Sequence, residues 1–138
     1  MAKGKILIVD DEPDVLTYLQ AVLENNGYET CSAESVEQGL KLLEGMTPDL
    51  VCLDIMMPRQ LGLTLYARMK KDARWQNIPV LILSGVVQEE EFDFRNFIPD
   101  QKIPRPQDYL EKPIEREKFL ETVERIIAQS RIGLKKGT

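Results

Sequence analysis

Short apolar runs alternate with segments of helical periodicity along the chain, and this alternation restricts the fold more than any other feature of the sequence. The runs are rich in branched residues and most are flanked by polar or turn-forming residues, which is typical of strands buried within a sheet. The five runs are Lys5–Val9, Tyr28–Ala33, Asp49–Leu53, Pro79–Leu83 and Tyr109–Leu110. Strands separated by helices form right-handed βαβ units, which build a parallel sheet.

Between these runs, apolar residues recur at spacings of three and four, as on the buried face of a helix. The first such segment begins at Pro13 and ends before Gly27, and Ser35 is a favourable cap for the second. In the last segment Phe119 and Val123 begin the apolar set. We therefore predict an α/β fold with a flavodoxin-like, doubly wound, five-stranded parallel sheet in the order 2-1-3-4-5.

Residues 87–108, where the fourth helix should lie, depart from this pattern. Residues 89–97 are long enough for two helical turns, but Pro99, Pro104 and Pro106 prevent a helix from continuing beyond them. Proline lacks the amide donor and clashes with the preceding turn. We expect a short or irregular fourth helix followed by a long loop.

Length and composition indicate one domain and exclude several functions. We assign residues 1–130 of the 138 to this domain and expect residues 131–138 to be a frayed tail. The absence of histidine excludes His-based triads, His zinc sites and a phosphohistidine carrier. A net charge of −5 argues against direct nucleic-acid binding. No apolar run approaches the ~20 residues of a membrane helix and no signal peptide is present, so we expect a cytoplasmic protein without membrane contact.

Acidic residues follow two of the predicted strands. Asp10 and Asp11 end the first strand, and Asp54 ends the third. In this strand order the topological switch point lies between those two strands, where open α/β sheets bind ligands. Two like charges 4 Å apart repel by about 4 kcal/mol at an effective dielectric constant of 20, so the cluster requires a cation. Oxygen ligands without histidine or cysteine favour Mg²⁺.

Two further strands add polar residues to the same edge. Ser84 follows the fourth strand and Lys112 follows the fifth. A metal ion and an ammonium group offset charge on phosphoryl oxygens, and a hydroxyl group donates a hydrogen bond to them. Because a carboxylate can act as the nucleophile, this set of residues fits phosphoryl transfer to an aspartate.

Four motifs in this order resemble those of the bacterial response-regulator receiver domain, the phosphoacceptor part of two-component signalling. The motifs are Ile8-Val9-Asp10-Asp11-Glu12, Leu53-Asp54-Ile55-Met56-Met57-Pro58, Leu83-Ser84-Gly85 and Tyr109-Leu110-Glu111-Lys112-Pro113. The resemblance spans residues 5–129. It implies a single-domain switch that takes its phosphoryl group from a histidine kinase or a small acyl phosphate and acts on a downstream protein that the sequence does not identify.

The resemblance also implies a role for each residue of the motifs. Asp54 is the expected phosphoacceptor, and Asp10, Asp11, Asp54 and the backbone carbonyl of Met56 are the expected Mg²⁺ ligands. Lys112 and Ser84 are expected to bind the phosphoryl oxygens, and Tyr109 to move inward as part of the switch. Such domains usually have a cis peptide bond before Pro113. Beyond its own phosphorylation and slow dephosphorylation, we expect no enzymatic activity.

Three features differ from the usual pattern of this family. Leu61 stands where an acidic residue usually precedes Gly62. Twenty-eight positions separate Ser84 from Lys112, which is longer than usual, in a region that commonly carries dimerisation and output contacts. Nothing after residue 130 is long enough for a DNA-binding module. A scaffold that binds its partner regardless of phosphorylation is therefore the alternative function. An aspartyl phosphatase fits less well, because Asp10 and Asp11 are adjacent rather than two positions apart.

Overall fold

The central sheet has five parallel strands, and their order places the ends of β1 and β3 side by side. The computed structural model describes residues 2–57, 60–85 and 94–136. The sheet order is β2-β1-β3-β6-β7, which confirms the predicted order 2-1-3-4-5. Its strands are β1 (Lys5–Val9), β2 (Glu29–Ala33), β3 (Leu50–Asp54), β6 (Val80–Ser84) and β7 (Asp108–Glu111).

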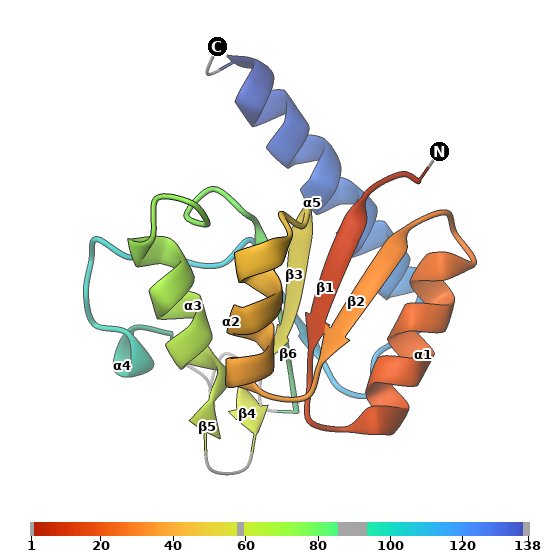
Figure 1. Ribbon diagram of the computed structural model, residues 1–138, viewed down its shortest axis with the longest axis horizontal. Helices are drawn as coiled ribbons and strands as arrows, with labels where there is room; N and C mark the ends of the chain where they lie inside the picture. Colours follow the sequence, from red (N-terminus) through yellow and green to blue (C-terminus); the bar gives the residue numbers. More distant parts are fainter. Residues whose placement is uncertain (1, 58–59, 86–93, 137–138) are drawn as a thin grey trace.

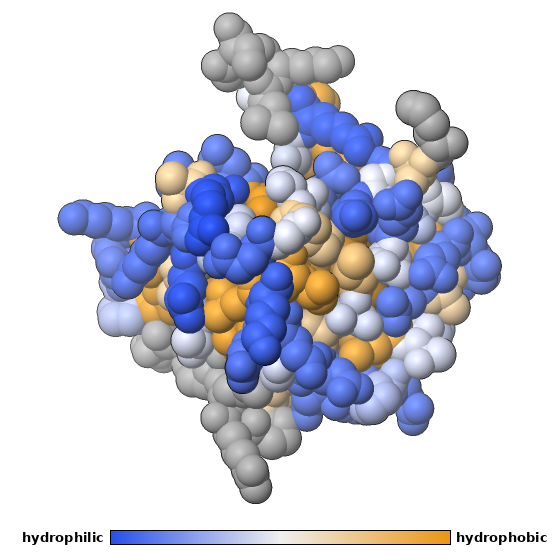
Figure 2. Space-filling view, viewed as in Figure 1, coloured by the Kyte–Doolittle hydropathy of each residue, from blue (hydrophilic) through white to orange (hydrophobic). Residues whose placement is uncertain are grey.

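Helices cover both faces of this sheet. They are α1 (Pro13–Glu24), α2 (Val36–Gly45), α3 (Gly62–Lys71), α4 (Phe94–Phe97) and α5 (Arg116–Lys136). Figure 1 shows α2 and α3 in front of the sheet and α5 behind it. As predicted, Pro13 opens α1, and Ser35 caps α2 by accepting a hydrogen bond from the amide of Gln38 at 3.1 Å. Seen from the α2–α3 side, the surface is largely polar, with apolar residues showing between the charged ones (Figure 2).

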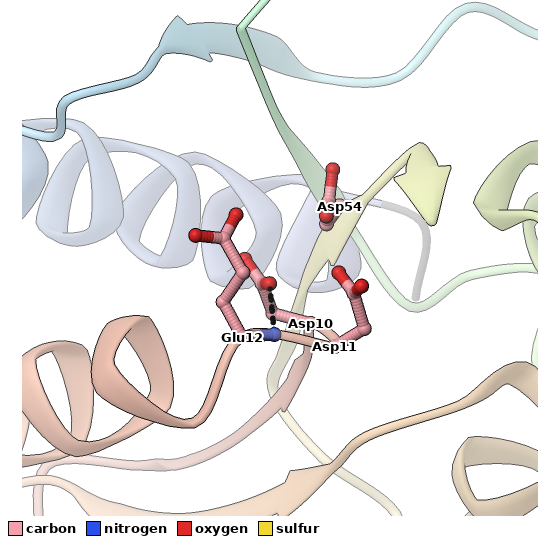
Figure 3. Close-up of side chains that lie close together, drawn as sticks. All are labelled: Asp10, Asp11, Glu12 and Asp54. Atoms are coloured by element: carbon pink, nitrogen blue, oxygen red, sulfur yellow. Dashed lines mark hydrogen bonds between the residues drawn. The ribbon is translucent and has the colours of Figure 1, made fainter. Parts of the chain in front are cut away.

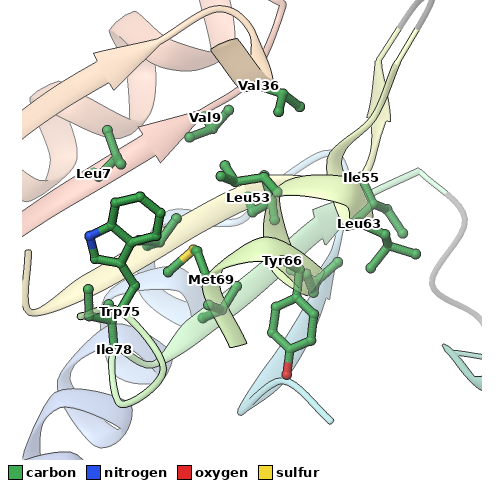
Figure 4. Close-up of a cluster of buried hydrophobic side chains, with 14 of the residues drawn as sticks. Leu7, Val9, Val36, Leu53, Ile55, Leu63, Tyr66, Met69, Trp75 and Ile78 are labelled. Carbon is green, nitrogen blue, oxygen red and sulfur yellow. The ribbon is translucent and has the colours of Figure 1, made fainter. Parts of the chain in front are cut away.

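Two apolar clusters hold the three layers together. Side chains alternate along each strand, so Leu7 and Val9 face α2 and α3, whereas Ile6 and Ile8 face α1 and α5. The cluster on the α2–α3 side is drawn in Figure 4 and includes Trp75, which lies beyond the end of α3. The three central strands, β1, β3 and β6, are buried on both faces, which explains why they are continuous apolar runs in the sequence.

The described part of α4 is short and a long loop separates it from β7, as expected. The described part of the fourth helix is the four-residue α4, and residues 86–93, which include part of the predicted two helical turns, lie outside the described residues. Phe94 is buried edge-on against Tyr66 of α3, with ring centroids 5.6 Å apart. The Tyr66 hydroxyl donates a hydrogen bond to the Pro104 carbonyl at 2.5 Å, which fastens the proline-rich loop to α3.

Two features differ from the sequence-based prediction. A two-stranded antiparallel hairpin of β4 (Met56–Met57) and β5 (Gln60–Leu61) stands where a loop was expected. The prediction of a frayed tail from residue 131 was wrong, because α5 continues to Lys136. Most residues from Arg131 to Lys136 are good helix formers, and Arg131 donates a hydrogen bond to the Lys3 carbonyl at 2.6 Å.

The longest helix, α5, carries many charged residues along its 21 positions. Among the described residues, no helix combines the length and apolar character needed to cross a bilayer.

Candidate functional site

The candidate site forms where β1 and β3 end next to each other. Val9 and Leu53 are paired in the parallel register of these strands, so the following residues, Asp10 and Asp54, emerge at the same sheet edge. Carboxylate oxygens of Asp10, Asp11, Glu12 and Asp54 all lie within 4.8 Å of one another (Figure 3). The structure therefore brings together the three predicted carboxylates and adds a fourth, from Glu12.

Main-chain amides orient two of these carboxylates. The Glu12 amide donates a hydrogen bond to Asp10 Oδ1 at 2.9 Å, and the Met56 amide donates one to Asp54 Oδ1 at 3.1 Å. Asp10 is completely buried and Asp54 is 2% exposed. The Met56 side chain is exposed at the rim of the site, and the use of its carbonyl as a metal ligand stays a prediction.

Lys112 faces this acidic group from the end of β7. Its Nζ lies 2.8 Å from Asp10 Oδ2, 2.9 Å from Glu12 Oε1 and 3.4 Å from Asp54 Oδ2. Its amide also donates to the Ser84 carbonyl at 2.9 Å, which fixes the start of the loop after β7. The Lys112–Pro113 peptide bond is cis, as expected. Burial disfavours the ammonium charge, but hydrogen bonds to Asp10 and Glu12 outweigh it, and the pKa of Lys112 is raised.

The Asp54 carboxyl is held in surroundings that oppose its ionisation. Burial is the largest cause and raises the pKa of Asp54 to about 6, with the negative charge of Asp10 adding to the effect. The Met56 amide and the Lys112 ammonium act in the opposite direction, because both favour the carboxylate. The surrounding residues therefore stabilise the negative charge of the Asp54 carboxylate only in part, and a bound cation would stabilise it further.

Ser84 and Tyr109 lie on the two strands beyond β3. Ser84 is fully buried at the end of β6, one position after Leu83, which is the register partner of Asp54. Tyr109 is half-buried and packs against the apolar cluster on the α2–α3 side. Burial raises the pKa of its phenol, although the nearby Arg105 guanidinium lowers it. Both residues are on the expected elements, and their roles in the switch stay predictions.

Two residues that matter to the site were not singled out from the sequence. Glu12 belongs to the acidic run after β1, but its contact with Lys112 joins residues 100 positions apart. Gly62 begins α3, where an added Cβ would lie 2.1 Å from the Asp54 carbonyl oxygen and 2.9 Å from the Ile55 Cα. Only glycine allows this approach without displacing the backbone that carries Asp54. The sequence offers one signal for it, a glycine at the start of a helix after a short turn.

The donor set fits a hard divalent cation. The four carboxylates supply only oxygen ligands, and no histidine is present in the chain. Mg²⁺ prefers a few carboxylates together with water, which is the kind of donor set that this group would offer. Asp10, Asp11 and Asp54 are the residues that would hold it.

Comparison with known proteins identifies the family. A family model described as the response regulator receiver domain matches residues 6–124. The chain belongs to this family.

Relatives of this receiver domain differ in how much of their length it covers. PilH of Pseudomonas aeruginosa is 35% identical over 125 residues, which cover 91% of this chain and 98% of PilH. The DNA-binding transcriptional regulator RpaA of Synechocystis is 32% identical over 128 residues, which cover 91% of this chain and 50% of RpaA. A sensor protein from Polaromonas sp. JS666, known from a crystal structure, has a sequence 25% identical to this chain. The two structures superpose with a TM-score of 0.82, and the match covers 93% of this chain and 98% of that one. The receiver fold therefore occurs both alone and as part of longer proteins.

Proposed function

We propose that this receiver domain is a phosphoacceptor switch in which Asp54 takes a phosphoryl group. The observation that carries the proposal is the position of Asp54: its carboxylate lies within 4.8 Å of three other carboxylates and 3.4 Å from the Lys112 ammonium. This arrangement offers a nucleophile beside a cation site and a fixed positive charge.

Phosphoryl transfer at this site is a displacement at phosphorus. A carboxylate oxygen of Asp54 attacks, a new P–O bond forms, and the bond from phosphorus to the donor nitrogen or oxygen breaks. The bonding electron pair leaves with the donor, and the product is an acyl phosphate. Bound Mg²⁺ supplies charge stabilisation for the phosphoryl oxygens. The Lys112 ammonium adds a second positive charge at the same edge, and the Ser84 hydroxyl is placed on the adjacent strand to donate a hydrogen bond.

The acyl phosphate then biases the conformation of the domain. A ligand shifts a conformational equilibrium only through contacts that differ between the two states. Here those contacts are between the phosphoryl group and Ser84 and Lys112, which belong to β6 and to the end of β7. Tyr109 lies on β7 and packs beside the loop that carries Pro104, so rearrangement of β7 would reach that surface.

The partners follow from this chemistry. The donor is a sensor histidine kinase, whose phosphohistidine supplies the phosphoryl group, and the acceptor of the signal is a downstream protein. The near-complete match to PilH supports a domain that acts without an attached DNA-binding module. The domain catalyses its own phosphorylation and slow dephosphorylation and no other reaction, and its place of action is the cytoplasm.

Intact-mass measurement tests the phosphoacceptor. After incubation with acetyl phosphate and Mg²⁺, we expect one phosphoryl adduct on the wild-type chain and none on Asp54→Ala. Asp14→Asn is a matched control, because it removes an exposed acidic charge from α1 near the site, and it should retain the adduct. An adduct that persists in Asp54→Ala would refute the assignment. Equal affinity for a partner with and without the adduct would instead support the scaffold alternative.

A further inference from the structure

The Glu12 carboxylate lies in direct contact with the Lys112 ammonium group and contributes to its position in the site. Its Oε1 lies 2.9 Å from Lys112 Nζ, and Asp10 Oδ2 lies 2.8 Å from the same atom. Asp54 Oδ2 is farther away, at 3.4 Å. The ammonium is therefore drawn toward the start of α1 and away from the carboxylate that receives the phosphoryl group.

Glu12 approaches Lys112 from the solvent side. Its side chain is 58% exposed, whereas those of Lys112 and Asp10 are 16% and 0% exposed. Glu12 lines a groove between α1 and the loop after β7, together with Val15, Tyr18, Pro113 and Ile114 among others. It is the cap residue of α1 but makes no side-chain capping hydrogen bond. Its carboxylate is therefore not needed to start the helix.

We propose that Glu12 is a positioning residue that holds the Lys112 ammonium away from Asp54 and competes with phosphoryl oxygens for it. The proposal rests on the phosphoacceptor function. Asp10 and Asp54 are the expected cation ligands, and a bound cation would compete with Lys112 for their oxygens. Glu12 then remains as the carboxylate that retains Lys112. The phosphoryl group gains its ion pair with Lys112 only when the contact with Glu12 is given up.

Kinetics of phosphorylation test this competition. Glu12→Gln keeps the shape of the side chain and removes the charge that holds Lys112. We expect its second-order rate constant with acetyl phosphate and Mg²⁺ to rise about threefold, the effect of an ion pair that is partly exposed. Asp14→Asn removes an equal charge from the same groove and leaves the three carboxylates around Lys112 in place. It should change the rate constant less than about 1.5-fold, the range for an exposed charge acting through screened solvent.

A second measurement follows Lys112 directly in the metal-free protein. A lysine ammonium held in ion pairs exchanges its protons slowly and gives a resolved nitrogen-15 NMR signal. We expect this signal in the wild type and in Asp14→Asn, and a shifted or broadened signal in Glu12→Gln. The readout does not depend on phosphorylation, and a variant that merely loosened the fold would disturb the backbone amide spectrum as well.

The possible outcomes distinguish a failure of the proposed role of Glu12 from a failure of the phosphoacceptor function on which it rests. A wild type that takes no phosphoryl group overturns the phosphoacceptor function and this inference with it. A wild type that is phosphorylated, with Glu12→Gln and Asp14→Asn accelerated equally, overturns the role of Glu12 alone. A slower reaction in Glu12→Gln overturns it as well, because Glu12 would then aim Lys112 at the donor. An unchanged Lys112 signal in Glu12→Gln overturns the contact itself.

Discussion

Asp54 is ionised at neutral pH in a place that favours its neutral form. Its pKa is raised from 3.8 to about 6, chiefly by burial. A carboxyl group with a raised pKa in the folded state binds its proton more tightly there than in the unfolded chain. Between about pH 4 and pH 6 the folded chain therefore binds more protons at this residue, and stability falls as the pH rises through that window. Above pH 6 the full penalty remains, and it is the stability that the site gives up to keep this carboxylate ionised.

Removing this charge should stabilise the metal-free domain. Asp54→Asn keeps the shape of the side chain, and at pH 7.5 we expect the free energy of unfolding to rise by about 1–2 kcal/mol. Each pKa unit corresponds to about 1.4 kcal/mol, and the expected gain is smaller than the full shift because the substitution also gives up the ion pair with Lys112. Urea denaturation in EDTA at pH 7.5 and pH 4 measures the difference, which should shrink at pH 4. A variant no more stable than the wild type at pH 7.5 would contradict the raised pKa.

At the residue scale, the sequence predicted correctly those site residues whose place is fixed by the end of a strand. Asp10 and Lys112 directly follow strands and Asp54 ends one, and the ends of these strands meet at one edge, so topology alone brings the three residues together. Glu12 is different, because its place in the site depends on the direction of a flexible side chain at the start of α1. Hydrophobic periodicity contains no information on that direction.

At the scale of elements, the contact between α3 and the end of β3 determines where Asp54 stands. The Gly62 amide donates a hydrogen bond to the Ile55 carbonyl at 3.0 Å, which ties the first turn of α3 to the segment after Asp54. The same closeness leaves no space for a side chain at Gly62.

Gly62→Ala should therefore disturb the fold and the site together. We expect a loss of about 2 kcal/mol in the free energy of unfolding, within the range for overpacking, and weaker Mg²⁺ binding. Gly45→Ala is the control, because no atom lies within 4 Å of an added Cβ at the end of α2. It should change stability by less than about 1 kcal/mol and leave Mg²⁺ affinity unchanged. Equal effects of the two substitutions, measured by denaturation and calorimetry, would show that the contact at Gly62 does not position Asp54.

The elements that sequence reasoning missed are those without a repeating pattern. β4 and β5 have two residues each, too few to show the alternation that identifies a strand. The end of α5 was misjudged because Lys135, Lys136 and Gly137 suggested fraying, whereas lysine is a good helix former and the single glycine inside the helix, Gly133, costs only about 1 kcal/mol. Three of the five main strands, β1, β3 and β6, are apolar runs of four or five residues, and all five strands were predicted.

At the scale of the whole molecule, negative charge is concentrated at one edge of the sheet. Four carboxylates gather there in a chain whose net charge is −5, and Lys112 is the ammonium paired with three of them. The strands that deliver these residues run through both apolar clusters. Unfolding therefore separates all of the carboxylates at once, and cation binding at this edge is linked to the stability of the entire domain.

Mg²⁺ should accordingly raise the thermal midpoint of the wild type. Binding only to the folded state adds RT ln(1 + [L]/Kd), about 2.7 kcal/mol at a hundredfold excess over Kd. Asp11→Asn removes one carboxylate of the group and should lose most of this gain, whereas Asp14→Asn should keep it. The gain should also shrink at pH 5, because protonation of Asp54, with its pKa of about 6, competes with the cation. Calorimetry with NaCl at matched ionic strength isolates the specific effect, and equal gains in Asp11→Asn and Asp14→Asn would mean that Mg²⁺ merely screens the acidic edge.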